Sequence, residues 1–496
     1  MTEQPLLRPS ENCWRVERAN EFAILIDADI YFSAARLAMK AAKRSIYLVG
    51  WDFNARVALG HPDVQDEAPK GVGDFLLWLA KRNPDLEIRL LLWNPALLSS
   101  WLKVANVPYL LRWKLNRQIT VKLDGNHPVG SSHHQKILVI DDSLAFCGGI
   151  DVTTDRWDTR AHLDDAPKRR RPDGTTYGPW HDASSYCIGP AARALGDLCR
   201  ERWQLAGGEK LEPVEQHADF PRVEGAIAFG EVDLAISRTS PAYDDREKIT
   251  EIERLYVDMV MSAQKVVYAE SQYFASRAVA QAIARRLAEP DGPEFVLINP
   301  VKADDWLGSL AMDSARARLR ESLRRHDLHN RLRIYHPVTA RGEPIYVHSK
   351  LMIVDNERMR VGSSNFNNRS MRFDNECDVA FEALGSEALR AKLENLRNDL
   401  LGEHLGVAVS SFRDVVEREG SVIAAVEALR HSAGPGERAS KRTLIPYETP
   451  ALADLTQWLA DNEILDPEGP EQIFEAIERR GLFRGRLKMP LRKSGT

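Results

Sequence analysis

Two short segments of the 496-residue chain repeat one spacing of histidine, lysine and aspartate. Both follow the pattern H-x-K-x-x-x-x-D, and the two copies are His134/Lys136/Asp141 and His348/Lys350/Asp355. The pair Gly148-Gly149 follows the first copy, and Gly362-Ser363 follows the second at the same interval. Two matching copies argue against a coincidence between unrelated core strands. We therefore interpret them as two parts of one site.

The residue types in this pattern suit phosphodiester chemistry. Residues two apart on a β-strand project to the same face, so the histidine and lysine of each copy point into one pocket. Lysines neutralise oxygens that gain charge in the transition state, and histidines act as nucleophile, acid or base near neutral pH. Paired histidines also bind metals, but two lysines would repel a cation, and H-E-x-x-H is absent from the sequence. We predict no catalytic metal and no cofactor.

The neighbours of these residues are predicted to be structural. Asp141 and Asp355 stand an odd number of residues beyond their lysines, so on a regular strand they face away from the pocket. We include them in the candidate site as motif members and expect them to close each strand into its turn. His133, beside His134, points to the opposite face and is interpreted as a structural residue.

The elements that must position the motifs recur in the same order twice along the chain. Apolar segments predict strands at 46–53, 88–94 and 136–140, and again at 266–274, 295–300 and 350–354. Helical patterns alternate with these strands, which indicates an α/β fold with helices covering the sheets. The predicted fold is two tandem α/β/α sandwich domains that form a pseudo-dimer, with a helical C-terminal appendage.

Composition suggests where the predicted units divide. The units are an N-terminal half at 1–205, a C-terminal half at 223–400 and a mostly helical appendage at 405–496. Residues 206–222 are rich in glycine, proline and charge, as expected of a linker. Helical patterns at 410–431 and around 448–482 fill the appendage, whose role the sequence does not indicate.

Charge and cysteine content limit the class of protein. The formal net charge of −5 argues against a generally nucleic-acid-binding surface. Five scattered cysteines without a C-x-x-C pair predict reduced thiols. The N-terminus lacks a secretory signal, and apolar runs stay short of about 18 residues. We expect a cytoplasmic protein, with peripheral membrane contact left open.

Two local segments each allow two interpretations. Residues 94–118 mix leucine, tryptophan and basic residues, which fits a core-packing helix and, as the weaker alternative, a helix lying on lipid. The basic run 168–171 is interpreted as a solvated loop rather than a headgroup-binding patch.

The duplicated motif resembles the hallmark of the phospholipase D superfamily, and the resemblance spans about residues 20–400. The segment HHQKILVIDDSLAFCGGIDVTTDRWD is similar to the first motif of the phosphatidylcholine-hydrolysing phospholipases D. The segments IYVHSKLMIVD and GSSNFNNRSM resemble their second motif, and YAESQYF and GPWHD resemble two further signatures. Cardiolipin synthase-like proteins share the motif pair.

This resemblance implies roles for the site residues. His134 would attack phosphorus to give a phosphohistidine, and His348 would protonate the departing alcohol and then activate water; which histidine attacks is taken by analogy. Lys136, Lys350 and Asn365 would hold the phosphoryl oxygens. A carboxylate should orient each histidine, and the candidates are Asp182 for His134 and Glu376 for His348. Many family members carry asparagine where this chain has Asp151, so a direct phosphate contact there is not expected.

The function predicted from these features is a phospholipase D or phosphatidyltransferase, acting on a phospholipid with water or an alcohol as acceptor. Cardiolipin synthesis from phosphatidylglycerol is the nearest alternative, because the same intermediate serves both reactions. A nuclease of the superfamily and a non-enzymatic lipid-binding protein rank lower. We expect a monomer with peripheral membrane contact and no nucleic-acid partner.

Overall fold

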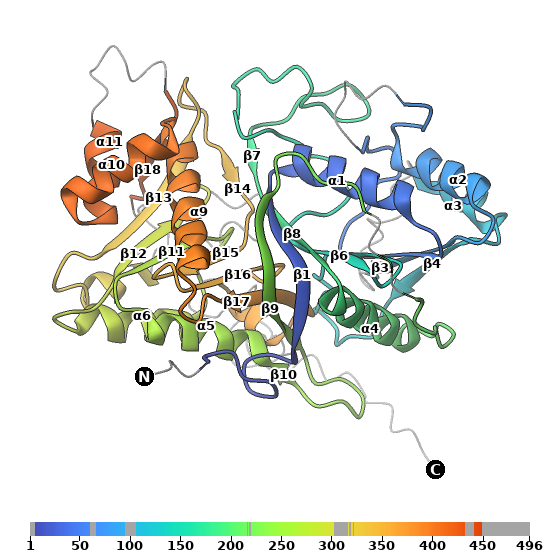
Figure 1. Cartoon of the computed structure of the whole chain (residues 1–496), viewed down its shortest axis with the longest axis horizontal. Coiled ribbons are helices and arrows are strands. Elements are labelled where there is room, and N and C mark those ends of the chain that lie inside the picture. The colour runs from blue at the N-terminus through green and yellow to red at the C-terminus, as the bar shows by residue number, and fades with distance from the viewer. Residues whose placement is uncertain are drawn as a thin grey trace, which may run out of the picture.

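The computed structural model describes residues 5–59, 66–94, 106–215, 217, 220–301, 316, 319–320, 322–431 and 441–448. Within these residues one continuous sheet of 16 strands runs through the molecule, with helices packed on its faces (Figure 1). The sheet joins two halves whose strands follow each other in the same spatial order. This arrangement confirms the predicted α/β pseudo-dimer.

The strands of each half lie in a corresponding order from the outer edge of the sheet to its centre. The N-terminal half contributes β4 (Ile119–Asp124), β3 (Glu87–Trp93), β2 (Ser45–Gly50), β5 (Ile137–Ile140), β6 (Leu144–Gly148), β8 (Ala183–Ile188) and β1 (Arg15–Ile26). The C-terminal half contributes β13 (Leu332–Val338), β12 (Glu294–Ile298), β11 (Val266–Glu270), β15 (Leu351–Val354), β16 (Arg358–Gly362), β17 (Glu376–Glu382) and β9 (Ile227–Ser240).

The two halves are related strand by strand. In each, the three outer strands are parallel, and the motif strand (β5 or β15) joins them antiparallel. At the centre β1 pairs antiparallel with β9, so the halves share one ladder. The short strand β10 (Ile249–Thr250) pairs with β9. A separate parallel ribbon joins β7 (Trp180–His181) of the first half to β14 (Tyr346–Val347) of the second.

Ten helices are described. They are α1 (Ala28–Ala41), α2 (Val72–Arg82), α3 (Val107–Lys114), α4 (Pro190–Leu205), α5 (Glu251–Ser262), α6 (Arg277–Ala288), α8 (Asn368–Arg372), α9 (Glu387–Leu405), α10 (Val409–Glu419) and α11 (Val422–His431). Helix α9 has conventional ends: the Ser386 hydroxyl accepts from the backbone N–H of Leu389, and Gly406 closes it with φ +64°.

The motif strands are buried on both faces, which explains why their sequences are almost wholly apolar. On β5, Ile137 and Val139 pack in the core shared by the two halves, whereas Leu138 and Ile140 pack under α1 and α2. Strand β15 alternates in the same way between the shared core and the core under α5 and α6. Each strand end is thereby fixed from both sides, and the residues just before it carry the motif histidines and lysines.

The described part of the C-terminal region packs on the C-terminal half. Helices α10 and α11 confirm the helical pattern at 410–431, but Phe412, Val422 and Val426 belong to the shared core. Strand β18 (Thr443–Pro446) extends the main sheet by pairing antiparallel with β13. The described part of the predicted helical appendage, residues 405–431 and 441–448, therefore packs against the C-terminal half. The helix predicted at 448–482 lies almost entirely outside the described residues.

Two local predictions are partly answered. Within 94–118, helix α3 buries Trp113, while Val107, Leu111 and Leu115 stay 38%, 62% and 88% exposed; residues 95–105 lie outside the described part. The basic run 168–171 is not simply a solvated loop. Its Arg169 is buried and donates hydrogen bonds to Asp158 and to three backbone carbonyls.

Candidate active site

Backbone pairing between the halves brings the two motif copies together. The N–H of His134 donates to the carbonyl of Asn375 in the second half, at 2.8 Å. The N–H of His348 donates to the carbonyl of His181 in the first half, also at 2.8 Å, continuing the ribbon of β7 and β14. Each motif histidine is therefore seated on a segment that the opposite half supplies.

This exchange corrects the predicted pairing of histidines and carboxylates. Nδ1 of His134 lies 3.0 and 3.1 Å from the carboxylate oxygens of Glu376, and Nδ1 of His348 lies 2.7 Å from Asp182. The prediction had Asp182 beside His134 and Glu376 beside His348, which is wrong. The reason is geometric: each carboxylate directly follows the residue whose carbonyl accepts the opposite histidine's N–H. Both dyads consequently span the two halves.

Both imidazoles lie in a desolvated and positively charged environment. The side chain of His134 is 15% exposed and that of His348 is 6% exposed. Burial, followed by the charges of Lys136 and Lys350, holds the pKa of His134 well below its usual range. Burial and Lys350 do the same to the pKa of His348, to which Lys136 and His134 also contribute. A lowered pKa favours the neutral imidazole near pH 7. A neutral imidazole can act as a nucleophile or accept a proton.

The two lysines face this site from unlike surroundings. Nζ of Lys136 lies 3.1 Å from Oδ2 of Asp151 and donates to the carbonyl of His134 at 2.8 Å. Lys350 donates to the carbonyl of His348, and burial lowers its pKa to about 7, against the opposing pull of Asp182. The first lysine carries a carboxylate counter-ion, whereas the second is held in a drier position.

Asp151 and Asn365 occupy equivalent positions, each 17 residues after its motif histidine. The Asp151 carboxylate pairs with Lys136 and accepts from the backbone N–H of Trp51 at 3.0 Å. Asn365 is 3% exposed, and its Oδ1 accepts no hydrogen bond from the part of the chain that is described. A buried amide left in this state is poised to reorient toward a ligand. Asp151 forms an ion pair with Lys136, and its negative charge would repel a phosphate. This agrees with the expectation that Asp151 does not contact phosphate.

The carboxylate of Glu376 is held by hydroxyl groups that the sequence did not single out. Ser370 donates to its Oε1 at 2.7 Å, and Ser363 donates to its Oε2 at 2.5 Å. Burial raises the pKa of Glu376 to about 8, although both hydroxyls oppose the rise. Both serines lie in the segment GSSNFNNRSM, which resembles the second family motif. The sequence therefore marked the segment, but it did not indicate that these two hydroxyls contact Glu376.

The motif aspartates lie away from the site, as their odd spacing predicted. Asp141 accepts three backbone N–H groups, from residues 43–45, at 2.6 to 2.8 Å. Asp355 accepts the equivalent three from residues 264–266, at 2.5 to 2.8 Å. Each aspartate clamps the turn that leads into the strand beside its motif strand. They are structural residues and do not belong with the catalytic candidates.

His133 is likewise structural. Its Nε2 lies 3.0 Å from Asp124, and the guanidinium of Arg202 joins the same buried group. Burial, reinforced by Arg202, lowers the pKa of His133 to about 4. The ring is thus neutral, away from the pocket, and anchors the segment that leads into His134.

Aromatic rings wall the site on both sides. Trp51 stacks on Trp93 with ring centroids 5.8 Å apart and meets the His134 ring edge-on at 6.0 Å. On the other side Trp180 stacks on Tyr346 and lies 5.2 Å from the His348 ring. The site therefore combines apolar walls with a polar, cationic floor.

Comparison with known proteins agrees with this geometry. A family model described as "Phospholipase D" matches residues 38–282, and one described as "Cardiolipin synthase, PLD-like domain" matches residues 256–396. The chain belongs to the phospholipase D superfamily. The recognition drawn from the duplicated motif is confirmed.

Relatives with curated names are distant in sequence. Phospholipase D A of Dictyostelium discoideum is 23% identical over 77% of this chain and 35% of its own length. Phospholipase D alpha 1 of Nicotiana tabacum is 24% identical over 75% of this chain and 63% of its own length. Phospholipase D1 of Saccharomyces cerevisiae is 23% identical over 58% of this chain and 22% of its own length. The chain therefore spans less than two thirds of the length of each of these three relatives.

Among solved structures, phosphatidylserine synthase of Haemophilus influenzae Rd KW20 shares the fold. It superposes with a TM-score of 0.52 and 16% sequence identity, covering 80% of this chain and 93% of that protein. Within the described residues no helix has the length and apolar character needed to cross a membrane.

Proposed function

We propose that this chain is a phospholipase D-type phosphodiesterase, which removes the headgroup of a phospholipid through a phosphohistidine and passes the phosphatidyl group to water or an alcohol. One observation carries the proposal: two histidine–carboxylate dyads, each built from both halves, share a site with two lysines. Such a site supplies a nucleophile, an acid and cationic partners for one phosphodiester, without a metal.

The first chemical step uses both histidines at once. Neutral His134 attacks phosphorus through Nε2, and the bond from phosphorus to the headgroup oxygen breaks. His348, protonated on Nε2, gives its proton to that oxygen, so the headgroup leaves as an alcohol rather than an alkoxide. The anionic phosphate counters the lysine charges that lower the pKa of His348, which favours the protonated form when substrate is bound.

The second step reverses the roles of acid and base. His348 takes a proton from water or an alcohol, whose oxygen attacks phosphorus, and the P–N bond to His134 breaks. Glu376 and Asp182 hold the two rings by Nδ1 and stabilise whichever imidazolium forms. Lys136, Lys350 and the amide of Asn365 would bind the phosphoryl oxygens as their charge grows.

Two features favour a lipid as the substrate. The curated relatives bear the name phospholipase D, and aromatic rings wall the site on both sides, with Arg156 stacked on Trp180. Helix α3 packs beside this wall, where Trp51, Trp93, Leu110 and Trp113 line one small cavity. The exposed Leu111 of α3, and Leu115 just after the helix, would suit peripheral contact with a membrane. Because one chain holds both motif copies, a monomer suffices for the site.

A cardiolipin synthase is the second candidate. The observation favouring it is the family model over residues 256–396, whose description names cardiolipin synthase. The same phosphohistidine, resolved by the free hydroxyl of phosphatidylglycerol, would give cardiolipin. The two functions differ in acceptor, so an acceptor experiment separates them.

The test is one purified protein offered three substrates with EDTA present: phosphatidylcholine with ethanol, phosphatidylglycerol alone, and DNA. Phosphatidylethanol is the expected product. Cardiolipin without phosphatidylethanol would establish the second candidate, and cut DNA would establish a nuclease. If no product forms from any substrate, the protein would be a non-enzymatic binding protein. His134→Ala and His348→Ala should each abolish turnover, because nucleophile and acid act as a unit. Activity that vanishes at once on adding EDTA would contradict the mechanism.

A further inference from the structure

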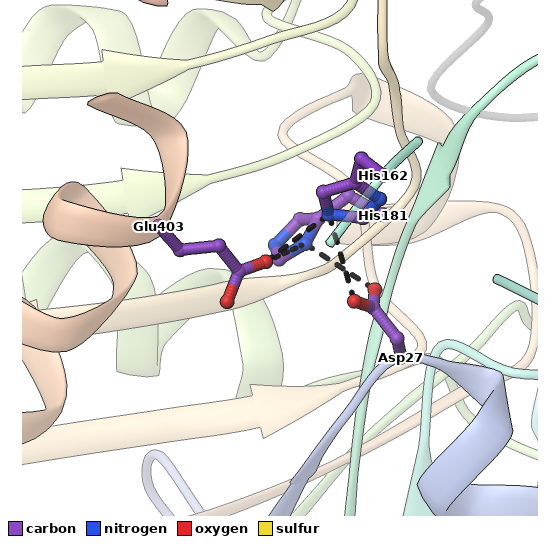
Figure 2. A group of neighbouring side chains, drawn as sticks. All are labelled: Asp27, His162, His181 and Glu403. Carbon is purple, nitrogen blue, oxygen red and sulfur yellow. Dashed lines mark hydrogen bonds and ion pairs between the residues drawn. The ribbon is translucent and has the colours of Figure 1, made fainter. Parts of the chain in front are cut away.

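A second group of buried histidines and carboxylates lies behind His348. Asp27 precedes α1, His162 stands in a loop, His181 is in β7, and Glu403 is in the last turn of α9. Figure 2 shows both imidazoles between the two carboxylates. All four residues are buried, with exposures of 1%, 1%, 0% and 6%. None of them belongs to the catalytic dyads.

In each side chain one polar atom is anchored by a neighbour. Nδ1 of His162 lies 3.2 Å from Asp158, and Nε2 of His181 lies 2.9 Å from Glu270. The remaining anchors are made by the carboxylates: Oδ1 of Asp27 accepts the backbone N–H of residue 182 at 3.0 Å, and Oε2 of Glu403 accepts from Arg160. The anchoring leaves one atom of each group directed inward.

The inward atoms have the separations expected around one tetrahedral ion. Nε2 of His162 lies 3.5 Å from Oδ2 of Asp27 and 3.1 Å from Oε1 of Glu403. Nδ1 of His181 lies 3.3 Å from Oε1 of Glu403, and also 3.3 Å from Oδ1 of Asp27, the oxygen that accepts the backbone N–H. All four donor atoms lie within 4.8 Å of one another. A tetrahedron with metal–ligand bonds of about 2.0–2.1 Å has edges of about 3.3 Å.

Hydrogen bonding alone leaves part of this group unsatisfied. The contact between His162 and Glu403 has hydrogen-bond geometry, but Oδ2 of Asp27 and Nδ1 of His181 have no hydrogen-bond partner within the described residues. Leaving a buried polar atom unpaired costs about 1–3 kcal/mol. Asp27 and His162 also adopt positive φ angles of 67° and 41°, a strained backbone state that is typical of functional positions.

The charges around the group favour a cation. Four carboxylates meet in this region, from Asp27, Asp158, Glu270 and Glu403. Arg160 pairs with Glu403, and Arg169 pairs with Asp158. The described partners of Asp27 and Glu270 are histidines, hydroxyls and a backbone N–H. The charge of Arg442 also acts on Glu403 and Asp27, but no arginine among the described residues pairs directly with Asp27. A divalent ion at the centre would supply positive charge in direct contact with Asp27.

We propose that Asp27, His162, His181 and Glu403 form a closed binding site for a divalent transition-metal ion, with Zn²⁺ as the first choice. Two imidazole nitrogens and two carboxylate oxygens in a tetrahedron suit zinc, and the absence of exposure fits a structural rather than a catalytic ion. The histidine–carboxylate contacts to Asp158 and Glu270 are the outer-shell partners that metal-bound histidines usually have.

Such an ion would serve the active site by positioning. It would tie α9 to three segments of the first half, and the peptide after His181 carries Asp182, the partner of His348. The carbonyl of His181 also accepts the N–H of His348. The metal thus supports one dyad from behind and takes no part in the bond changes at phosphorus, so this site does not depend on the proposed reaction.

The first experiment measures the metal content of the whole chain, purified without chelators, by inductively coupled plasma mass spectrometry. We expect about one zinc ion per chain, held by nitrogen and oxygen ligands at about 2.0–2.1 Å in X-ray absorption spectra. EDTA should leave it in the folded chain and remove it after unfolding, because the ligands are buried. Stoichiometric Fe²⁺ or Mn²⁺ with this ligand set would also support the site.

The second experiment compares His162→Gln with His431→Gln, since His431 is exposed and stands far along the chain. The first variant should lose at least nine-tenths of its metal, while the second keeps the wild-type content. A folded His162→Gln chain that retains the full content would overturn the assignment. So would folded wild-type protein holding less than a tenth of an ion per chain after refolding with Zn²⁺, a result that needs no variant to fold.

Discussion

The crossed dyads predict that Glu376→Gln and Asp182→Asn impair different steps of the reaction. Glu376 contacts the proposed nucleophile, His134, whereas Asp182 contacts the proposed acid, His348. Each amide keeps the shape of the side chain but cannot carry the negative charge that stabilises an imidazolium once the ring becomes positive. With a natural substrate each change should lower kcat by roughly 10²–10⁴-fold, about 3–5 kcal/mol of transition-state stabilisation.

A substrate with an activated leaving group separates the two effects. Phosphatidyl-p-nitrophenol releases a phenolate that needs no proton from His348. Asp182→Asn should therefore still give a rapid burst of p-nitrophenol, about one equivalent per site, followed by slow turnover, since His348 must still activate water. Glu376→Gln should lose the burst itself, because attack by His134 is the impaired step.

Stopped-flow absorbance provides the assay, and Asp124→Asn provides a matched control. Asp124 is a buried carboxylate paired with His133 at 3.0 Å, outside the site, so its loss should leave the burst intact in folded protein. Loss of the burst in Asp182→Asn, with its survival in Glu376→Gln, would refute the crossed assignment and restore pairing within each motif's own half. Equal loss of the burst in both variants would refute the division of roles.

Three further results are expected. Burial places the pKa of Lys350 at about 7, so kcat/KM should fall about tenfold per pH unit as its ammonium is lost above that pH, and Lys350→Arg should flatten this limb; a profile unchanged by the arginine would contradict the assignment. Asp151→Asn frees Lys136 from a 3.1 Å ion pair, so inhibition by inorganic phosphate should strengthen by roughly tenfold, and an unchanged inhibition constant would argue against phosphate binding there. Asp355→Ala leaves three backbone N–H groups without an acceptor, so it should lower the free energy of unfolding in urea by about 2–3 kcal/mol while the folded protein keeps its kcat. Loss of kcat with unchanged stability would mean that Asp355 has a catalytic role.

The sequence predicted the motifs, the two-half fold and the identities of both carboxylates because each has a local signal. Strand periodicity and duplication are properties of neighbouring residues, and they singled out His134, Lys136 and their counterparts, which the fold brings together. The pairing of Asp182 with His348 depends instead on which strand of one half meets which segment of the other. Such long-range register leaves no mark in the spacing of one half, so proximity in sequence favoured the wrong partner.

The same limit applies to the buried metal candidate. Asp27, His162, His181 and Glu403 are spread over almost 380 residues, and no two of them share a metal-ligand spacing. His181 stands in GPWHD, where the sequence drew attention to the neighbouring aspartate instead. Positive φ angles and unpaired buried atoms, which reveal the group, exist only in the folded chain.

The duplicated halves support their two histidines by different means, and this difference gives the histidines different characters. Glu376 accepts hydrogen bonds from two serine hydroxyls of its own half, 13 and 6 residues before it in the sequence. Asp182 instead donates its backbone N–H to Asp27, and through Asp27 it is joined to His181, Glu403 and helix α9. Loosening that second group should therefore disturb His348 and the steps that move protons, and leave attack by His134 largely intact. A symmetric fold thus acquires an asymmetric mechanism from the residues that stand behind its histidines.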